Sequence, residues 1–453
     1  MRDALHKHRL FLAVMTAILF LSFAFDAFGA MNSLSFVSDY KDSEALVVSE
    51  IACHGLDGGF LLTDKSGDPA HEVFHCTPKQ LTYYGSQFGL QGRIYSLGYD
   101  LLSPAHVSIG IYVKLAQLLT ALLSAFCFAL VALWARSRHG LVPAVTFTLL
   151  IAISPMPVGF ARNLYWALPL LVAPIIFVLW GYRRQASAAR RAIFWSIVGL
   201  LTCAKFLCGY EYVTSLAVMV VAGVAYHLYL ERAKRQIYFK ELALAFAVVV
   251  LSFFVAMGIH VIALTPVAGS FGKAVEVVKL DALKRTVNTG GYASYAITGL
   301  QTNLPDFYLI TNAYAGLSGH VHSHNIVWAA MSAGLNYIFM PIINLPVVLD
   351  QPFATYVQSF AAIAVVLVLL FVNRAKWVIA SQQRAVEALF VGAGVGMLAY
   401  LSWLIFAPSH SLVHAFLNGI LLFMPFALFA YIILGLYLDY LLQKFKTPRF
   451  RKA

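Results

Sequence analysis

Residues 242–263 read LALAFAVVVLSFFVAMGIHVIA, an apolar run that directly follows a segment containing Arg232, Lys234, Arg235 and Lys240. About 20 apolar residues in helical conformation are enough to cross the hydrocarbon core of a bilayer. Further runs of this kind divide the chain at roughly 9–30, 108–134, 141–160, 164–182, 192–209, 213–230, 352–373, 386–407 and 415–440. The sequence therefore predicts an all-α polytopic membrane protein with about ten transmembrane helices and two large periplasmic loops.

The distribution of charge predicts the orientation of these helices. If the N-terminus is cytoplasmic, the loops on that side hold 21 of the 32 Lys and Arg residues and only four of the 20 Asp and Glu residues. The loops on the opposite side hold nine basic and 14 acidic residues. Loops rich in Lys and Arg stay in the cytoplasm. We therefore expect a bacterial inner-membrane protein with both termini in the cytoplasm.

Composition excludes a soluble or nucleic-acid-binding protein. Hydrophobic residues make up 60% of the chain and charged residues 11%, as expected for a bundle that faces lipid. The net charge of +12 comes from basic residues in short loops beside helix ends, where they contact anionic lipid headgroups. Membrane lipids, and not nucleic acid, are the expected partners of these residues.

The runs divide the chain into five parts. Residues 1–30 form the first transmembrane helix, which we expect to remain uncleaved because its apolar run is longer than that of a signal peptide. Residues 31–107 form an acidic periplasmic loop, 108–263 form helices two to seven, and 352–453 form the last three helices and a basic cytoplasmic tail. Residues 264–351 form a second periplasmic or interfacial loop, with 325–349 as a re-entrant or amphipathic segment. An extra pair of spans between 290 and 350 is the alternative.

Two of the five cysteines share the first periplasmic loop. Cys53 and Cys76 are expected to form a disulfide in the oxidising periplasm, and two free thiols are the alternative. Cys127, Cys203 and Cys208 lie in apolar runs and are expected to be small core residues.

Unusual polar residues from separate parts of the chain share one depth, near the outer ends of the predicted helices. Ionisable groups at membrane depth are costly and often mark a substrate path. The candidate substrate-binding residues are Lys114, Arg162, Lys205, Glu211, His410 and His414. Each has a structural alternative: Arg162 as an anchor at the headgroups, Lys205 as a snorkelling side chain or the partner of Glu211 in an ion pair.

Acidic residues just beyond the first helix are candidates for a catalytic carboxylate. Asp39 directly follows that helix, and a helix cap is its structural alternative. Asp42 is the second candidate, although solvated positions are the favoured interpretation of Asp42 and Glu44.

Metal and phosphate-loop patterns are weak. His410 and His414 would share a helical face, which suits substrate hydrogen bonding better than metal ligation, and ordinary interfacial histidines are the structural alternative. No cofactor is firmly predicted, and a divalent cation at the carboxylates stays open.

In these features the chain resembles the GT-C superfamily of integral-membrane glycosyltransferases. The shared features are the acid Asp39 after the first span, the long first outer loop, about ten spans, the outer cations and the stretch Arg162-Asn-Leu-Tyr-Trp166. The family usually has paired acids with one residue between them, whereas here Tyr40 and Lys41 separate Asp39 from Asp42. The resemblance implies a polyprenyl-phosphate-linked sugar as donor and a periplasmic glycan, lipid or protein as acceptor.

The resemblance also implies an inverting mechanism. Asp39 would orient or deprotonate the acceptor hydroxyl, while Arg162 and Lys205 would stabilise the departing lipid phosphate. A transporter or flippase of a lipid-linked or anionic substrate is the alternative, and it predicts polar groups across the full depth of the membrane. A structural subunit of an envelope-polysaccharide assembly is a third interpretation.

The charge asymmetry generates a prediction of topology. Reporter fusions at position 60 and at the C-terminus should signal periplasmic and cytoplasmic locations respectively, because moving the basic loops across the membrane is unfavourable. A cytoplasmic signal at position 60 would contradict the orientation and the periplasmic location of the candidate site.

Overall fold

The computed structural model describes residues 2–31, 41–53, 62, 67–68, 73–74, 84–102, 105–286, 338, 343, 359–413 and 419–446. The described elements are α1 (Arg2–Phe25), α3 (Lys41–Cys53), β1 (Gly67–Asp68), β2 (Val73–Phe74), α4 (Leu90–Leu102), α5 (Ile109–His139), α6 (Leu141–Ala152), α7 (Pro155–Ala161), α8 (Leu168–Gly181), α9 (Ala188–Cys208), α10 (Val213–Leu230), α11 (Arg235–Ala268), α12 (Phe271–Thr286), α17 (Phe360–Val372), α18 (Arg374–Trp377), α19 (Gln383–Phe406), α20 (Pro408–Val413), α21 (Ile420–Leu422), the π-helical turn η3 (Phe423–Ala427) and α22 (Leu428–Lys446).

The membrane helices agree with the apolar runs of the sequence. Within the described ranges, seven helices are long and apolar enough to cross a membrane, and the bent pair α6 and α7 makes an eighth if it is counted as one span. Two shorter apolar helices, α8 and α17, lie at the predicted spans 164–182 and 352–373. The fold is that of an all-α polytopic membrane protein, as predicted.

One predicted span is not a straight helix. The predicted span 141–160 consists of two helices, because α6 and α7 meet at an angle of 70°, and the pair can still be counted as one span. The cause is local: Pro155 begins α7, and a proline disfavours helical conformation in the residue before it. Ser154 is accordingly extended, and its hydroxyl donates to the Leu150 carbonyl at 2.6 Å.

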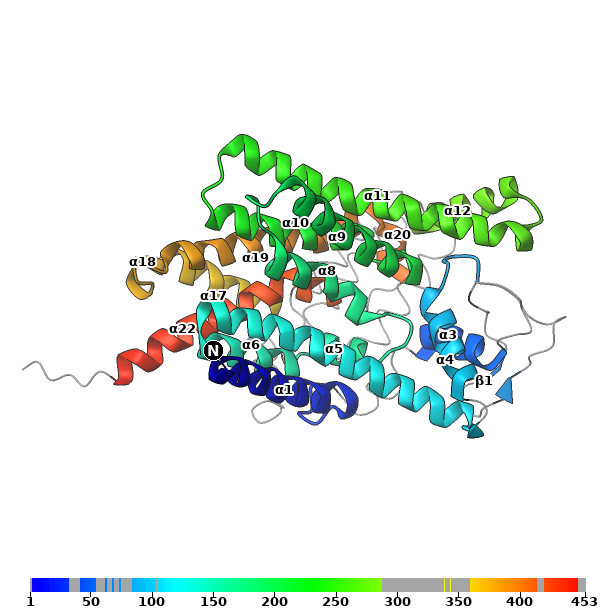
Figure 1. Ribbon diagram of the computed structural model, residues 1–453, viewed down its shortest axis with the longest axis horizontal. Helices are drawn as coiled ribbons and strands as arrows, with labels where there is room; N and C mark the ends of the chain where they lie inside the picture. Colours follow the sequence, from blue (N-terminus) through cyan, green and yellow to red (C-terminus); the bar gives the residue numbers. More distant parts are fainter. Residues whose placement is uncertain are drawn as a thin grey trace, which may run out of the picture.

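The two ends of the bundle differ in what they carry (Figure 1). The start of α1, the end of α22 and the short helix α18 lie at one end, here called the inner end, which is predicted to face the cytoplasm. The segments α3, α4, β1 and α12 lie at the opposite end, here called the outer end. An even number of crossings produces this arrangement, and its orientation in the membrane stays a prediction.

Close helix packing depends on small residues at two crossings. A Cβ at Gly396 of α19 would lie 2.8 Å from the backbone nitrogen of Phe426. A Cβ at Gly435 of α22 would clash with the backbone of Pro143 in α6. Small residues let membrane helices approach this closely. The outer surface of the helices carries exposed apolar side chains, for example Leu200 of α9, which is 69% exposed. A surface that faces lipid requires such side chains.

The first outer segment contains more regular structure than the term loop suggests. Helices α3 and α4 pack against each other, and β1 pairs with β2 in a two-stranded antiparallel sheet. The buried side chain of Leu62 fills the space beside Gly89 and Gly92 at the start of α4. In the second outer segment, α12 is described, whereas the predicted re-entrant segment 325–349 lies outside the described residues except for Ile338 and Ile343.

Cys53 ends α3 in a buried position and is disulfide-bonded. Cys127, Cys203 and Cys208 are free. Cys76, the predicted partner of Cys53, lies outside the described residues, so this pairing stays a prediction.

Peptide mapping without reductant should find Cys53 linked to Cys76. Such a bond closes a loop of more than 20 residues and should stabilise the acidic segment by roughly 3 kcal/mol. Two thiols that alkylate freely in protein isolated without reductant would contradict the pairing.

Candidate active site at the outer end of the bundle

The turn 162–166 between α7 and α8 lies at the centre of the candidate site. The amide oxygen of Asn163 accepts hydrogen bonds from the backbone nitrogens of Tyr165 at 2.9 Å and Trp166 at 3.3 Å. An Asn side chain that bonds to the backbone two residues ahead fixes a tight turn. The Tyr165 carbonyl also accepts from Gln91 of α4 at 3.1 Å, so the turn is held to the outer segment.

On one side of this turn lies a group that we call the Arg162 cluster, made of Asp26, Glu44 and Arg162. Glu44 of α3 accepts from the backbone nitrogen of Leu164 at 2.9 Å and from Gln117 of α5 at 3.0 Å. The carboxylate of Asp26, just after α1, accepts from the backbone nitrogens of Ala30 and Met31 at 2.7 and 3.0 Å. Three separate parts of the chain therefore contribute to this cluster.

Arg162 is partly exposed and interacts electrostatically with both carboxylates. Burial lowers the pKa of Arg162 below its ordinary value, and the attraction of Glu44 and Asp26 opposes that shift. An arginine stays protonated in proteins even so. The cluster therefore presents a permanent positive charge beside two acids, at a position that a ligand can reach.

On the other side of the turn lies a more buried group, the Glu211 cluster, made of Gln87, Tyr165, Lys205, Glu211 and Arg285. The Tyr165 hydroxyl lies 3.2 Å from Glu211 Oε1 and 3.1 Å from Gln87 Oε1. Arg285 Nη2 lies 3.8 Å from Glu211 Oε1. Glu211 is 4% exposed and Lys205 is 2% exposed, so these charges compensate each other away from water.

Lys205 lies in the last turn of α9, inside this cluster. Its ammonium donates to the Gly209 carbonyl at 3.4 Å and interacts electrostatically with Glu211. A side chain at Gly209 would clash with the carboxylate of Glu211 and the amide of Gln87. The stretch Gly209-Tyr-Glu211 thus needs glycine so that the acid can fold back over the end of α9.

Arg285 comes from α12, which follows α11 after Gly269 and packs against α11 and α20. Arg285 Nη2 also donates to the Ser86 carbonyl at 3.4 Å. Burial alone would lower the pKa of Arg285, but the attraction of Glu211 and its neighbours raises it above the ordinary value. Beside it, burial and the negative charge of Glu211 raise the pKa of the Tyr84 hydroxyl.

The structure brings some of the predicted site residues together and separates others. Arg162, Lys205 and Glu211 lie in the two clusters around the 162–166 turn. Lys114 of α5 is exposed and belongs to neither cluster. His410 lies in α20 with its ring 5.7 Å from that of Trp403. Whether any of them binds substrate stays a prediction.

Other candidates fall where the structure gives no description. Asp39 and His414 lie outside the described residues. Asp42 lies in the first turn of α3, and its side chain is also outside the description. Within the described ranges, no three His, Cys, Asp or Glu residues gather as a metal site would require.

Sequence reasoning missed three functional candidates. Glu44, expected to be solvated, is partly buried and accepts two hydrogen bonds. Tyr165 lies within the Arg162–Trp166 stretch, so its position was visible although its role was not. Arg285 is distant in sequence from every other member of the Glu211 cluster, and only the folding of α12 over the outer end brings it there.

Comparison with known proteins gives matches only among solved structures. No family model matches the chain, and no curated protein matches it. Among solved structures, it is similar to ArnT from Cupriavidus metallidurans bound to undecaprenyl phosphate, with 16% identity. The match covers 94% of this chain and 77% of that chain at a TM-score of 0.39.

Replacing Glu211 with alanine should destabilise the protein strongly. The change leaves Lys205 and Arg285 buried without their counter-charge, which typically costs roughly 3–5 kcal/mol. Thermal unfolding in detergent should show a clearly lower midpoint for Glu211→Ala than for Glu276→Ala, which removes an exposed acid from α12. Equal midpoints for the two variants would show that the Glu211 cluster does not support the fold.

Proposed function

We propose that this protein is a membrane glycosyltransferase of the GT-C kind, which transfers a sugar from a polyprenyl-phosphate donor to a periplasmic acceptor. The observation that supports this most is the Arg162 cluster. A reachable cation and two acids lie together at the outer end of a bundle whose sides are apolar. A polyprenyl phosphate combines the two properties that this surface would bind. Its hydrocarbon tail needs apolar helices, and its phosphate needs a cation at the membrane surface.

The proposed reaction forms one bond and breaks one. The acceptor oxygen attacks the anomeric carbon of the sugar, and the bond from that carbon to the lipid phosphate breaks with inversion. Asp39 takes the proton of the acceptor hydroxyl, and Arg162 stabilises the negative charge that the phosphate gains as it leaves. The second product is the free polyprenyl phosphate.

In this proposal Lys205 has a structural role and does not bind the donor. Its ammonium is almost completely buried and donates to Gly209, so it holds the Glu211 cluster and does not reach a lipid phosphate in this conformation. Arg285 is the better second cation because its side chain is 15% exposed and it lies on the outer segment α12. The proposed phosphate ligands are therefore Arg162 first and Arg285 second.

The distribution of ionisable groups favours an enzyme over a transporter. In the described helices, Lys205 and His260 lie toward the outer end, while His227, Glu241 and Glu387 lie toward the inner end. The segment of α10 between them, 213–226, carries no ionisable group other than Tyr226. A path for an anionic substrate through the membrane would need polar groups at that depth.

The test separates donor binding from turnover. Arg162→Gln should weaken the binding of undecaprenyl phosphate to the purified protein by about 10- to 100-fold, because a charge-assisted contact contributes roughly 1.5–3 kcal/mol. Lys273→Gln removes an exposed cation from α12 and should bind normally. Mass spectrometry of the wild-type protein should also detect a co-purified polyprenyl phosphate.

The same experiment assigns the base. Asp39→Asn should keep lipid binding but lower sugar transfer in isolated membranes by roughly 100-fold or more, the usual scale of general base catalysis. Loss of transfer in Asp42→Asn alone would move the base to Asp42. Full transfer in both variants, with normal binding in Arg162→Gln, would refute the proposed enzyme.

A further inference from the structure

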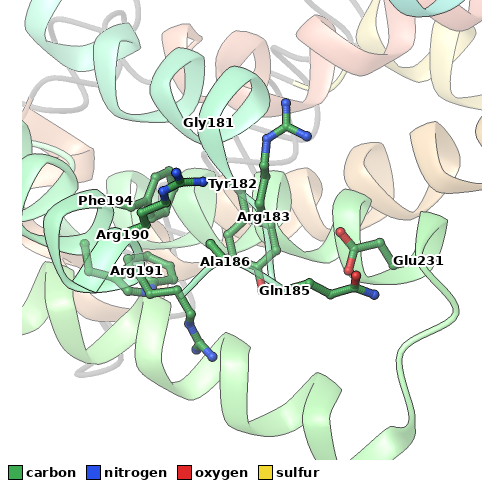
Figure 2. A pocket seen from close by; sticks show the side chains of 10 residues that line it. Gly181, Tyr182, Arg183, Gln185, Ala186, Arg190, Arg191, Phe194 and Glu231 are labelled. Carbon is green, nitrogen blue, oxygen red and sulfur yellow. The ribbon is translucent and has the colours of Figure 1, made fainter. Parts of the chain in front are cut away.

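A cavity of about 590 Å³ lies at the inner end of the bundle, at the opposite end from both outer clusters. Its walls are the connection between α8 and α9, the first two turns of α9 and the end of α10. Figure 2 shows Glu231 facing the side chains of the α8–α9 connection across the opening. The residues that matter most are Tyr182, Arg183, Arg190, Arg191, Trp195 and Glu231.

Two ion pairs fix the frame of this cavity. Arg191 Nη2 lies 2.6 Å from Glu241 Oε1, and the Tyr182 hydroxyl donates to Glu241 Oε2 at 3.1 Å. Glu241 is 4% exposed, so it holds both side chains from inside the protein. Arg184 pairs with Glu231 at 3.1 Å. Both acids are thereby satisfied by arginines.

The pairing leaves an excess of positive charge. Arg183 and Arg190 also line the cavity, are exposed, and form no ion pair within the part of the chain that the structure describes. Arg190 lies in the first turn of α9, where the helix dipole adds a partial positive charge. The site therefore has two uncompensated guanidinium groups, the donors best suited to a phosphate group.

The surroundings of the cavity are apolar. The cavity is lined in part by Phe194 and Trp195, whose rings lie 5.1 Å apart, and Trp195 is only 8% exposed. Two apolar side chains of the same helices, Trp180 of α8 and Ile193 of α9, are 41% and 61% exposed, as lipid-facing residues are. A ligand with a phosphate head and hydrocarbon tails would match both surfaces.

We propose that this cavity binds the phosphate headgroup of an anionic lipid from the inner leaflet. Arg183 and Arg190 contact the phosphate, Arg191 is held in place by Glu241, and the acyl chains lie along the exposed faces of α8 and α9. This site is separate from the proposed donor site, since it lies at the opposite end of the bundle.

The experiment uses the full-length protein in a neutral detergent, titrated with dioleoyl-phosphatidylglycerol and followed by native mass spectrometry. The double variant Arg183→Gln/Arg190→Gln should lose affinity by about tenfold or more. The matched control Lys234→Gln/Lys240→Gln removes the same charge from exposed positions on the neighbouring α11 segment, outside the cavity. It should bind like the wild type, and both variants should unfold at the wild-type temperature.

Further arms distinguish the source of the phosphate. Glycerol phosphate should fail to displace the lipid at equal concentration, and dioleoyl-phosphatidylcholine should bind weakly in comparison. The proposal would be overturned if the two double variants bound the lipid with equal affinity. The two arginines of the cavity would then matter no more for lipid binding than other basic residues on this face. Displacement by glycerol phosphate alone would overturn the lipid assignment and indicate a soluble phosphate ligand.

Discussion

The carboxylate of Glu211 joins segments that are far apart in the chain. Tyr165 reaches it from the turn before α8, Arg285 from α12, and Lys205 from the last turn of α9. None of these charged groups could be buried alone at acceptable cost, so each needs the others in place. Glu211 therefore joins α12, the 162–166 turn and the end of α9 to one another.

The two clusters differ in how far they are buried. In the Glu211 cluster, Lys205 and Glu211 are buried and support the site, and the side chain of Arg285 is 15% exposed. The Arg162 cluster keeps a permanent charge within reach of solvent or lipid. Leu164 and Tyr165 are consecutive, and they contact Glu44 and Glu211 respectively. A displacement of the 162–166 turn would therefore change the contacts of both clusters.

Much of the fold could be predicted from the sequence because the bilayer imposes length and composition on its helices. In the described residues, seven long apolar helices, the bent pair α6 and α7, and the two shorter helices α8 and α17 lie at the predicted spans. The site was only partly predictable. Lys205, Glu211 and Arg162 stand out because charge is rare at that depth, whereas Glu44 and Arg285 lie in polar segments where charge is ordinary. Their burial depends on tertiary packing that no local pattern encodes.

The bend between α6 and α7 has a consequence for the depth at which Arg162 lies. The seven residues of α7 would add roughly 10 Å along the axis of α6 if the helix continued straight. Turned by 70°, they add only about a third of that rise and run mostly sideways. If α6 crosses the membrane upright, α7 therefore runs nearly along the membrane surface. A longer α7 would then move Arg162 along that surface and change its depth little.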